Sequence, residues 1–410
     1  MSERRLGALA LATLLAGCGG PPAGNPMEQI LRSDDRLEDL LPEAPRFRLQ
    51  AVLGLIEPPR PESPDRRAVL VQHGFRLEEE YFYPASTVKL FAAVAALELL
   101  AELAASTGLP LGPDTRLVYH PLFEGEQLES WDETNLEGGA ITVRHEIRKL
   151  FLVSDNHAFN RLYELVGQDG LAASLAHAGL GEARIVHRLG EPRSAEENRR
   201  SPRIDFLGAG GGVLHSLPER TSSELPSRPG MPGLTVGRAH LTDAGQVDSP
   251  MDFSGKNRLG LADLQRGLCR VVRPDVDCGG PGFRLTNADR ELLLPAMSQY
   301  PGDSANPRYD RTAYPDEHVK YLLPGLEKVI PKNRLRIYNK VGQAYGFTTE
   351  NAWVVGEGTG ASFFLAATIY TNEDGVVNDD RYEYRETALP FFAALGEATA
   401  KWVWGKAPRR

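Results

Sequence analysis

The sequence predicts a mixed α/β (α+β) protein, because strand-like and helix-like patterns both recur along its 410 residues. Runs rich in Val, Ile, Leu and aromatic residues, typical of strands, lie near both ends of the chain. They cover residues 47–56, 67–73, 335–340, 351–356 and 361–370. Between them, a segment starting at Lys89 is dense in Ala, Leu and Val, as expected for a helix buried on most of its circumference. Strand pairing near both ends and helices in the middle therefore define the fold class.

The other elements follow from periodicity and from residues that start or stop helices. Helices are predicted at 27–41, 142–151, 158–166, 172–177, 261–272, 289–294 and 385–403. Thr142 is the expected N-cap of its helix, and Pro42 and Pro45 end the first one. From about Asn198 to Asn257 the composition shifts to Gly, Pro, Ser and Arg, which predicts an insertion with a hairpin that turns at Asp243-Ala-Gly.

Composition and charge exclude several classes of function. The chain has 46 basic and 55 acidic residues, a net charge of −9 without a basic stripe, so nucleic-acid binding is not expected. The nine histidines show no His-Glu-x-x-His or other metal spacing, and Ser254-Gly-Lys lacks the upstream glycine of a phosphate loop. We therefore expect no cofactor and no metal.

The N-terminus has the pattern of an export signal. Arg4-Arg5 precede a short apolar run that ends at Ala16-Gly17-Cys18. Leu15-Ala-Gly-Cys18 resembles the lipobox of bacterial lipoproteins, which implies a signal peptide at 1–17, cleavage before Cys18 and its lipidation, with 18–26 as a flexible tether. The resemblance implies a lipid-anchored protein on the periplasmic side of the outer membrane or at the cell surface.

The remaining cysteines, Cys269 and Cys278, are close in sequence and would be exported with the chain. Export to an oxidising compartment favours a disulfide between them. Two cysteines without matching histidines argue against zinc.

Ser86-Thr-Val-Lys89 places a hydroxyl and an amine at the start of the apolar helix. Residues three apart share a helix face, so a neutral Lys89 amine could take the proton of Ser86. Pro84 sets the entry of the helix, whose first turn has free N–H groups that can stabilise an oxyanion. The alternative is structural, with Ser86 as a helix cap and Lys89 solvated.

Two further motifs follow, Ser154-Asp155-Asn156 and Lys340-Val341-Gly342, at separations of 68 (154 − 86) and 186 (340 − 154) residues. The three motifs together resemble those of the penicillin-recognising serine hydrolases, and are most similar to class A β-lactamases. The resemblance implies a β-lactamase/transpeptidase-like fold: an antiparallel sheet formed by the N- and C-terminal segments and flanked by helices, plus an all-helical subdomain. It defines one catalytic domain at 27–405 with the insertion at about 198–257.

The resemblance also implies a role for each motif residue. Ser86 would be the acylated nucleophile, Lys89 its proton acceptor, and Ser154 the group that passes a proton to the leaving nitrogen. Asn156 would bind the substrate's side-chain amide, and Lys340 would supply positive charge. The substrate-binding strand would include Gly342 and Gln343, with the backbone N–H groups of Ser86 and Gln343 as the oxyanion hole.

Deacylation needs a second base, and Glu191-Pro192 matches the position of the class A glutamate in the loop after Ser-Asp-Asn. The alternative is a solvent-facing loop glutamate. The family's Asn four residues later is Ala195 here, with Asn198 as an approximate substitute. His157 is a second candidate base, or a residue that simply packs at a helix start.

Two departures concern substrate binding. Val341 and Gln343 replace residues that often carry a hydroxyl in the family, which predicts weaker binding of a β-lactam carboxylate. The functional hypothesis is a serine hydrolase acting on a β-lactam or related cyclic amide. The alternatives are a D,D-peptidase or esterase acting on cell-wall peptides or small esters, and a cell-envelope binding protein without turnover. The expected partners are a small-molecule or peptidoglycan-derived substrate and the membrane, and the chain is expected to be a monomer.

Overall fold

The computed structural model describes residues 24–59, 66–225 and 230–406. The predicted signal peptide at 1–17 and Cys18 lie outside the described residues, as does most of the predicted tether. The helices are α1 (Pro26–Leu31), α2 (Asp35–Glu38), α3 (Lys89–Thr107), α4 (Val143–Leu152), α5 (Asn156–His177), α6 (Ala195–Arg199), α7 (Leu261–Val272), α8 (Asn287–Ser298), α9 (Leu323–Leu326) and α10 (Leu389–Lys406).

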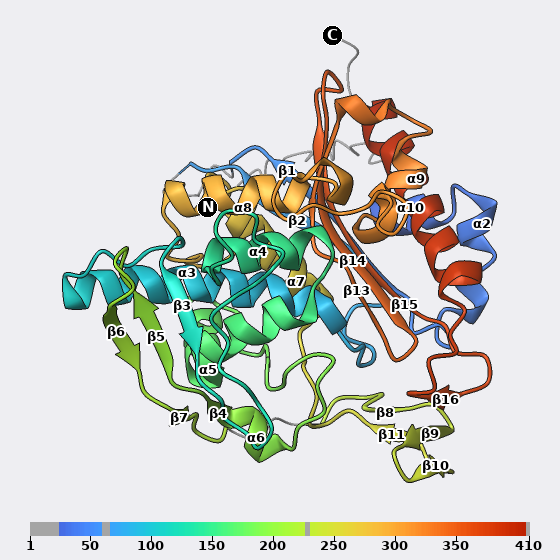
Figure 1. The fold of residues 1–410 in the computed structure, drawn as a ribbon. Coiled ribbons are helices and arrows are strands. Elements are labelled where there is room, and N and C mark those ends of the chain that lie inside the picture. The colour runs from blue at the N-terminus through green and yellow to red at the C-terminus, as the bar shows by residue number, and fades with distance from the viewer. Residues whose placement is uncertain (1–23, 60–65, 226–229, 407–410) are drawn as a thin grey trace, which may run out of the picture.

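The main sheet joins the two ends of the chain (Figure 1). Its strand order is β12 (Leu335–Asn339), β14 (Phe347–Gly356), β15 (Ser362–Tyr370), β1 (Gln50–Glu57) and β2 (Val69–Phe75), and β13 (Gly342–Ala344) also pairs with β14. Every pairing in it is antiparallel. The predicted sheet of N- and C-terminal strands is therefore confirmed.

The sheet lies between two apolar cores, because successive side chains of its central strands point to opposite faces. Phe363 and Leu365 of β15 pack with α1, α9 and α10, whereas Phe364 and Ala366 face the larger core that contains α3 and α7. Figure 1 shows α10 along one side of the sheet and α7 and α8 on the other. The central strands are thus buried on both faces, as their apolar composition indicates.

Helix α3 is the centre of the helical subdomain. Its residues from Lys89 to Glu98 are all buried, so the prediction of a helix enclosed on most sides is confirmed. It packs against α5 and α4. Gly108, in the left-handed region at φ 70°, ends the helix with its N–H on the Ala104 carbonyl.

The subdomain is not all-helical, which corrects the sequence analysis. β3 (Arg116–Tyr119) pairs with β5 (Ile204–Leu207), and β5 pairs with β6 (Val213–Leu217). β5 and β6 come from the Gly/Pro-rich insertion, where low apolar periodicity hid strands this short. Also in the insertion, β4 (Arg200–Ser201) pairs with β7 (Arg220–Thr221).

The second half of the insertion forms two short strand pairs. β8 (Thr235–Val236) pairs with β11 (Met251–Asp252), and β9 (Ala239–Thr242) forms a hairpin with β10 (Gly245–Val247), as the turn at Asp243 predicts. β9 also pairs with β16 (Val376–Val377), which follows the main sheet. The hairpin is therefore fastened to the C-terminal part of the chain.

Several predicted helices have different limits in the structure. The helix expected at 27–41 is two short helices, α1 and α2, and the helices expected at 158–166 and 172–177 are one element, α5, with a kink at Gly167. Thr142 caps α4 as predicted, because its side chain accepts the His145 N–H. Helix α7 has the predicted bounds.

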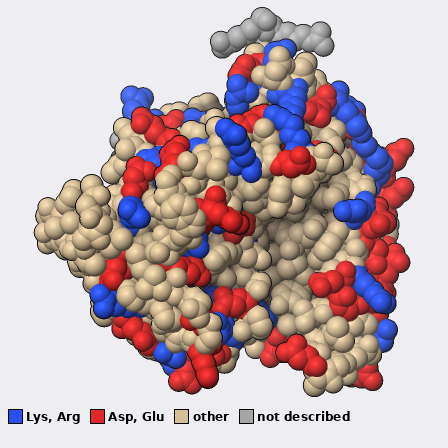
Figure 2. Space-filling view, viewed as in Figure 1, with Lys and Arg blue, Asp and Glu red and all other residues tan. Residues whose placement is uncertain are grey.

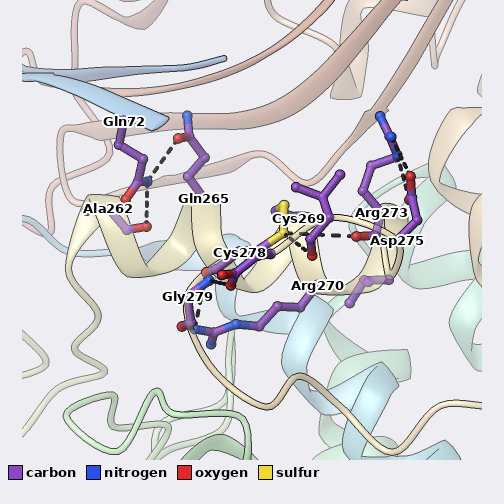
Figure 3. The surroundings of a disulfide bond; sticks show 12 residues. Gln72, Ala262, Gln265, Cys269, Arg270, Arg273, Asp275, Cys278 and Gly279 are labelled. Carbon is purple, nitrogen blue, oxygen red and sulfur yellow. Dashed lines mark hydrogen bonds and ion pairs between the residues drawn. A yellow bond between two sulfur atoms is a disulfide. The ribbon is translucent and has the colours of Figure 1, made fainter. Parts of the chain in front are cut away.

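Cys269 on α7 and Cys278 in the following loop, the two cysteines expected to pair, are joined by a disulfide (Figure 3). Beside it, the Arg270 guanidinium donates to the carbonyls of Ala178 and Gly279. The bridge and the arginine together fasten the loop after α7 to the subdomain.

A helix with the length and apolarity to cross a membrane is not found among the residues that the structure describes.

Candidate active site

Ser86 lies in a 3-10 turn, Ala85–Val88, that leads directly into α3. The preceding residue, Ala85, has φ 45°, a left-handed conformation that is unfavourable for a residue with a Cβ. Thr87 stabilises the turn, since its N–H and its hydroxyl both donate to the Pro84 carbonyl. The structure therefore holds the serine in a strained turn at a helix start, where reactive groups often occur.

Lys89 is fully buried, and within the described chain the hydrogen-bond partners of its amine all belong to the second motif. Its Nζ donates to the Ser154 carbonyl and to Asn156 Oδ1 at 2.6 Å, and lies 3.3 Å from Ser154 Oγ. Burial, followed by the charge of Lys340, holds the pKa of Lys89 well below its usual value. A lysine in this environment favours the neutral amine, the form that can accept a proton from Ser86, and the solvated alternative is wrong.

The turn between α4 and α5 presents Ser154 and Asn156. Ser154 has φ 58°, and Asp155 caps α5 by accepting the Ala158 N–H at 2.8 Å. A buried ion network beneath this turn fixes it: Asp132 binds both Lys149 at 2.7 Å and Arg161 at 3.0 Å. This network has no signature in the sequence, because Asp132 comes from a loop distant from both partners.

Lys340 follows β12 and is buried beside Ser154. Its Nζ donates to Ser154 Oγ at 2.8 Å and to the Val341 carbonyl at 2.9 Å. Burial lowers the pKa of Lys340 to about 7, an effect that the charge of Glu350 opposes. Ser154 Oγ thus lies between two lysines, Lys89 and Lys340, as a proton relay requires.

Next to Lys340 lies a cluster of three buried polar side chains, Lys320, Asn339 and Glu350, that the sequence did not predict. Asn339 connects the other two, because its Oδ1 accepts from Lys320 Nζ at 2.8 Å and its Nδ2 donates to Glu350 Oε1 at 2.7 Å. Burial lowers the pKa of Lys320 and raises that of Glu350. The sequence feature that could have indicated this cluster is Glu350, a charged residue inside the strand-forming run of β14.

The third motif packs its glycine directly against the Ser86 turn. A Cβ on Gly342 would lie 2.6 Å from the Pro84 carbonyl oxygen and 2.9 Å from the Ser86 nitrogen, so this position requires glycine. The approach brings the start of β13, and with it the backbone of Gln343, next to the nucleophile turn. The Gln343 side chain instead donates to Thr348 Oγ1 at 3.3 Å, and Val341 is buried in the apolar core behind the sheet.

The loop after Leu189 brings Glu191 to the cavity that Ser86 also lines. Glu191 Oε1 accepts from Arg193 Nε at 2.7 Å, and its Oε2 accepts from Asn160 Nδ2 at 3.3 Å. Gly190 has φ 68°, and a Cβ there would lie 2.6 Å from Asn156 Nδ2. Glu191 is therefore close to the site and held by partners on both oxygens, not directed to solvent.

Asn198, the approximate substitute for the family's asparagine, supports this loop from inside. Its Oδ1 accepts the Arg188 N–H at 2.9 Å, and its Nδ2 donates to the carbonyls of Arg193 and Ser194 at 3.0 Å. All its polar atoms are thus occupied by backbone. His157 also has a structural role, because its Nε2 pairs with Glu129 at 3.1 Å and the residue does not line the cavity in the described part of the chain.

The cavity has a volume of about 1200 Å³ and is open to solvent. Ser86, Asn156, Glu191 and Gln343 line its inner part, and the insertion hairpin (His240–Asp243) lines its rim. Figure 2 shows the hollow on this face, with acidic side chains along its border. Among the described residues there is no group of three or more His, Cys, Asp and Glu side chains able to hold a metal ion.

Comparison with known proteins points to the same family as the three motifs. Residues 74–205 match the sequence model of the beta-lactamase enzyme family, a segment that contains Ser86, Lys89, Ser154 and Glu191 and ends before Lys340. The resemblance predicted from the motifs is therefore confirmed over this segment. These findings support a β-lactamase-like serine hydrolase. No curated protein matches the chain in sequence.

Several solved structures are similar to this chain. A β-lactamase from Desulfarculus baarsii is 17% identical, with 92% of this chain and 98% of that chain covered and a TM-score of 0.47. A β-lactamase from Xanthomonas campestris pv. campestris is 18% identical (92% and 96% covered, TM-score 0.43). A class A β-lactamase from Mycobacterium abscessus is 16% identical (89% and 97% covered, TM-score 0.43).

Proposed function

We propose that the protein is a serine hydrolase that forms an acyl-enzyme at Ser86 and hydrolyses a β-lactam or a related cyclic amide. The observation that supports this most is the environment of Lys89, a fully buried amine with a lowered pKa one helical turn after Ser86. A buried lysine of this kind serves as a general base at neutral pH.

Acylation proceeds in two steps on this geometry. The neutral Lys89 amine takes the proton of Ser86 Oγ, which attacks the carbonyl carbon and forms a tetrahedral oxyanion. The backbone N–H groups of Ser86 and Gln343 stabilise that oxyanion. The carbon–nitrogen bond then breaks as Ser154 Oγ gives its proton to the leaving nitrogen. Ser154 Oγ takes a proton in turn from the Lys89 ammonium, 3.3 Å away, which restores the neutral amine, and the Lys340 ammonium, 2.8 Å from Ser154 Oγ, stabilises the oxygen during the transfer.

Deacylation is assigned to Glu191, the carboxylate beside Asn156 in the same cavity. The glutamate takes a proton from a water molecule, whose oxygen attacks the acyl carbonyl carbon. The bond between that carbon and Ser86 Oγ then breaks, and the proton passes from Glu191 to Ser86 Oγ, which restores both groups. Because Arg193 occupies Oε1, the water is expected at Oε2, which in the described part of the chain accepts from Asn160 Nδ2 at 3.3 Å. Turnover therefore depends on one oxygen of the carboxylate.

A D,D-peptidase or esterase is the second candidate. The cavity, about 1200 Å³, is larger than the range of roughly 300–1,000 Å³ that is usual for small-molecule sites. Val341 contributes an apolar side chain to the core and no hydroxyl to the site. The cavity volume favours a substrate larger than a β-lactam nucleus, and the missing hydroxyl favours one that does not depend on the β-lactam carboxylate.

The test is intact-mass spectrometry of protein incubated briefly and for a long time with benzylpenicillin, with Ser86→Ala as control. The protein should begin at residue 24, because Asn25 caps α1 and its Nδ2 donates to the Gly74 carbonyl at 2.6 Å. An adduct on Ser86 that clears as penicillin is hydrolysed is expected. A permanent adduct supports the peptidase, and no adduct refutes acylation by β-lactams.

We also propose that the mature protein is lipid-anchored at Cys18 in the cell envelope. Support comes from the sequence of the signal and lipobox. Replacing Cys18 with Ser should move the protein from the membrane fraction to the soluble fraction.

A further inference from the structure

We propose that Lys256 forms a binding subsite for a carboxylate on the acyl side of the substrate, the side that stays attached to Ser86. Lys256 follows β11 at the end of the insertion and lines the same cavity as Ser86. The proposal rests on acylation at Ser86 and adds the substrate class: an amide whose acyl portion is large and anionic.

The Lys256 ammonium is half-buried. Its Nζ lies 5.6 Å from the centroid of the Tyr345 ring, and no carboxylate forms an ion pair with it among the residues that the structure describes. Burial lowers the pKa of Lys256, with no acidic side chain near enough to oppose the effect. A partly desolvated cation with an aromatic wall and no partner is stabilised by an incoming anion.

Other charged side chains that line the cavity are in ion pairs or lie on exposed residues, so they do not neutralise the Lys256 ammonium. The guanidinium of Arg188 pairs with Glu164 at 2.8 Å, and that of Arg193 with Glu126 and Glu191 at 2.6 Å. The carboxylates of the rim, Asp243, Asp252 and Asp380, are on exposed residues. Among the described residues, the Lys256 ammonium is therefore a positive charge of this cavity that has no carboxylate partner.

His187 lies beside this charge and has an unused acceptor. Its Nδ1 lies 2.6 Å from the Arg188 carbonyl and donates to it, which leaves Nε2 as an acceptor; this atom is buried and has no hydrogen-bond partner in the described chain. Burial, with a smaller contribution from the Lys256 charge, lowers the pKa of His187 to about 4. The ring stacks on Tyr83, with 6.1 Å between ring centroids. A ligand that offers a carboxylate to Lys256 and an N–H to His187 would satisfy both groups.

The cavity lies on the acyl side of Ser86. Of the described residues, its lining includes Asn156, which is expected to bind the side-chain amide, and excludes Ser154 and Lys340, which serve the leaving nitrogen. From Ser86 it extends past Gln343 to Tyr345 and Lys256. The anionic group recognised by Lys256 therefore remains on the acyl-enzyme after the first step.

Two penicillins that differ by one carboxylate on the acyl side test this assignment: benzylpenicillin and its α-carboxy derivative. The full chain with Ser86→Ala, which cannot be acylated, is titrated with each by calorimetry. We expect the α-carboxy compound to bind about tenfold more tightly, the effect of one hydrogen bond to a charged group. Lys256→Met should remove that preference and leave the Kd of benzylpenicillin within about twofold.

Two further variants separate the subsite from a general effect of charge. Lys256→Arg should retain the preference, and Lys401→Met, which removes a positive charge from α10 outside the cavity, should not change it. Equal affinities, no binding, or a preference that survives Lys256→Met overturns the subsite. A Lys256-dependent preference in a protein whose Ser86 forms no adduct would refute the proposed function and retain the subsite.

Discussion

Replacing Lys340 with Arg tests the proton relay through the pH dependence of acylation. Below its pKa of about 7, Lys340 is an ammonium that donates to Ser154 Oγ, and above it the proton and the donated hydrogen bond are lost. Half of the molecules are protonated at pH 7 and about 1% at pH 9, so the acylation rate constant should fall about 50-fold between these values. An arginine stays protonated throughout this range, so Lys340→Arg should abolish the decline.

The assay is the single-turnover rate of adduct formation on Ser86, followed by mass from pH 5 to pH 10. Lys340→Met is the matched control, because it removes the donor and should be slow at every pH. A wild-type rate that stays constant up to pH 9, or a decline that persists in Lys340→Arg, would refute the role of the lysine. Thermal unfolding of each variant establishes that the larger guanidinium is accommodated.

Four other substitutions have defined outcomes. Glu191→Gln should accumulate the acyl-enzyme, with deacylation slower by about 100-fold or more and acylation little changed, measured by the lifetime of the adduct. Gly342→Ala should force β13 away from the nucleophile turn, costing about 1–3 kcal/mol of stability by urea unfolding and most of the acylation rate. Cys269→Ser should lower the free energy of unfolding by about 3 kcal/mol, measured as a lower thermal midpoint. The wild-type protein with its disulfide reduced should show the same midpoint. Glu350→Gln removes the carboxylate that favours the protonated form of Lys340. The alkaline decline in the acylation rate should therefore move to lower pH by about one unit, and a move to higher pH would contradict this.

The sequence predicted the elements whose pattern is local. Helix α7 and the hairpin at Asp243 have the predicted positions because amphipathic spacing and turn residues act over a few positions. The spacing of Ser86 and Lys89 is also a short-range feature, and the apolar composition of the helix that follows them predicts its burial. What could not be predicted is the partner of each side chain, because partners come from distant segments.

The loop at Glu191 illustrates this limit. Its position could be predicted from the motif, but the occupation of Oε1 by Arg193 depends on Glu126, which holds the same guanidinium from 67 residues away. Asn198 could be mistaken for a water-binding residue from its spacing alone. In the structure its side chain is used entirely by the loop backbone, a fact that only three-dimensional packing determines.

The three lysines near Ser86 show how burial and partners divide one residue type into different roles. Lys89 is fully buried, its hydrogen bonds go to neutral acceptors, and a second cation lies nearby, so the neutral amine is favoured. Lys340 is equally buried, but the carboxylate of Glu350 opposes the desolvation, so its charge is retained up to about pH 7. Lys256 is only half-buried and faces the cavity, where an ammonium without a counter-ion can exist in water and gains a partner when an anion enters. In the proposed mechanism the same side chain thus serves as a base, a hydrogen-bond donor and an anion-binding group, because burial and neighbouring charges differ at the three positions.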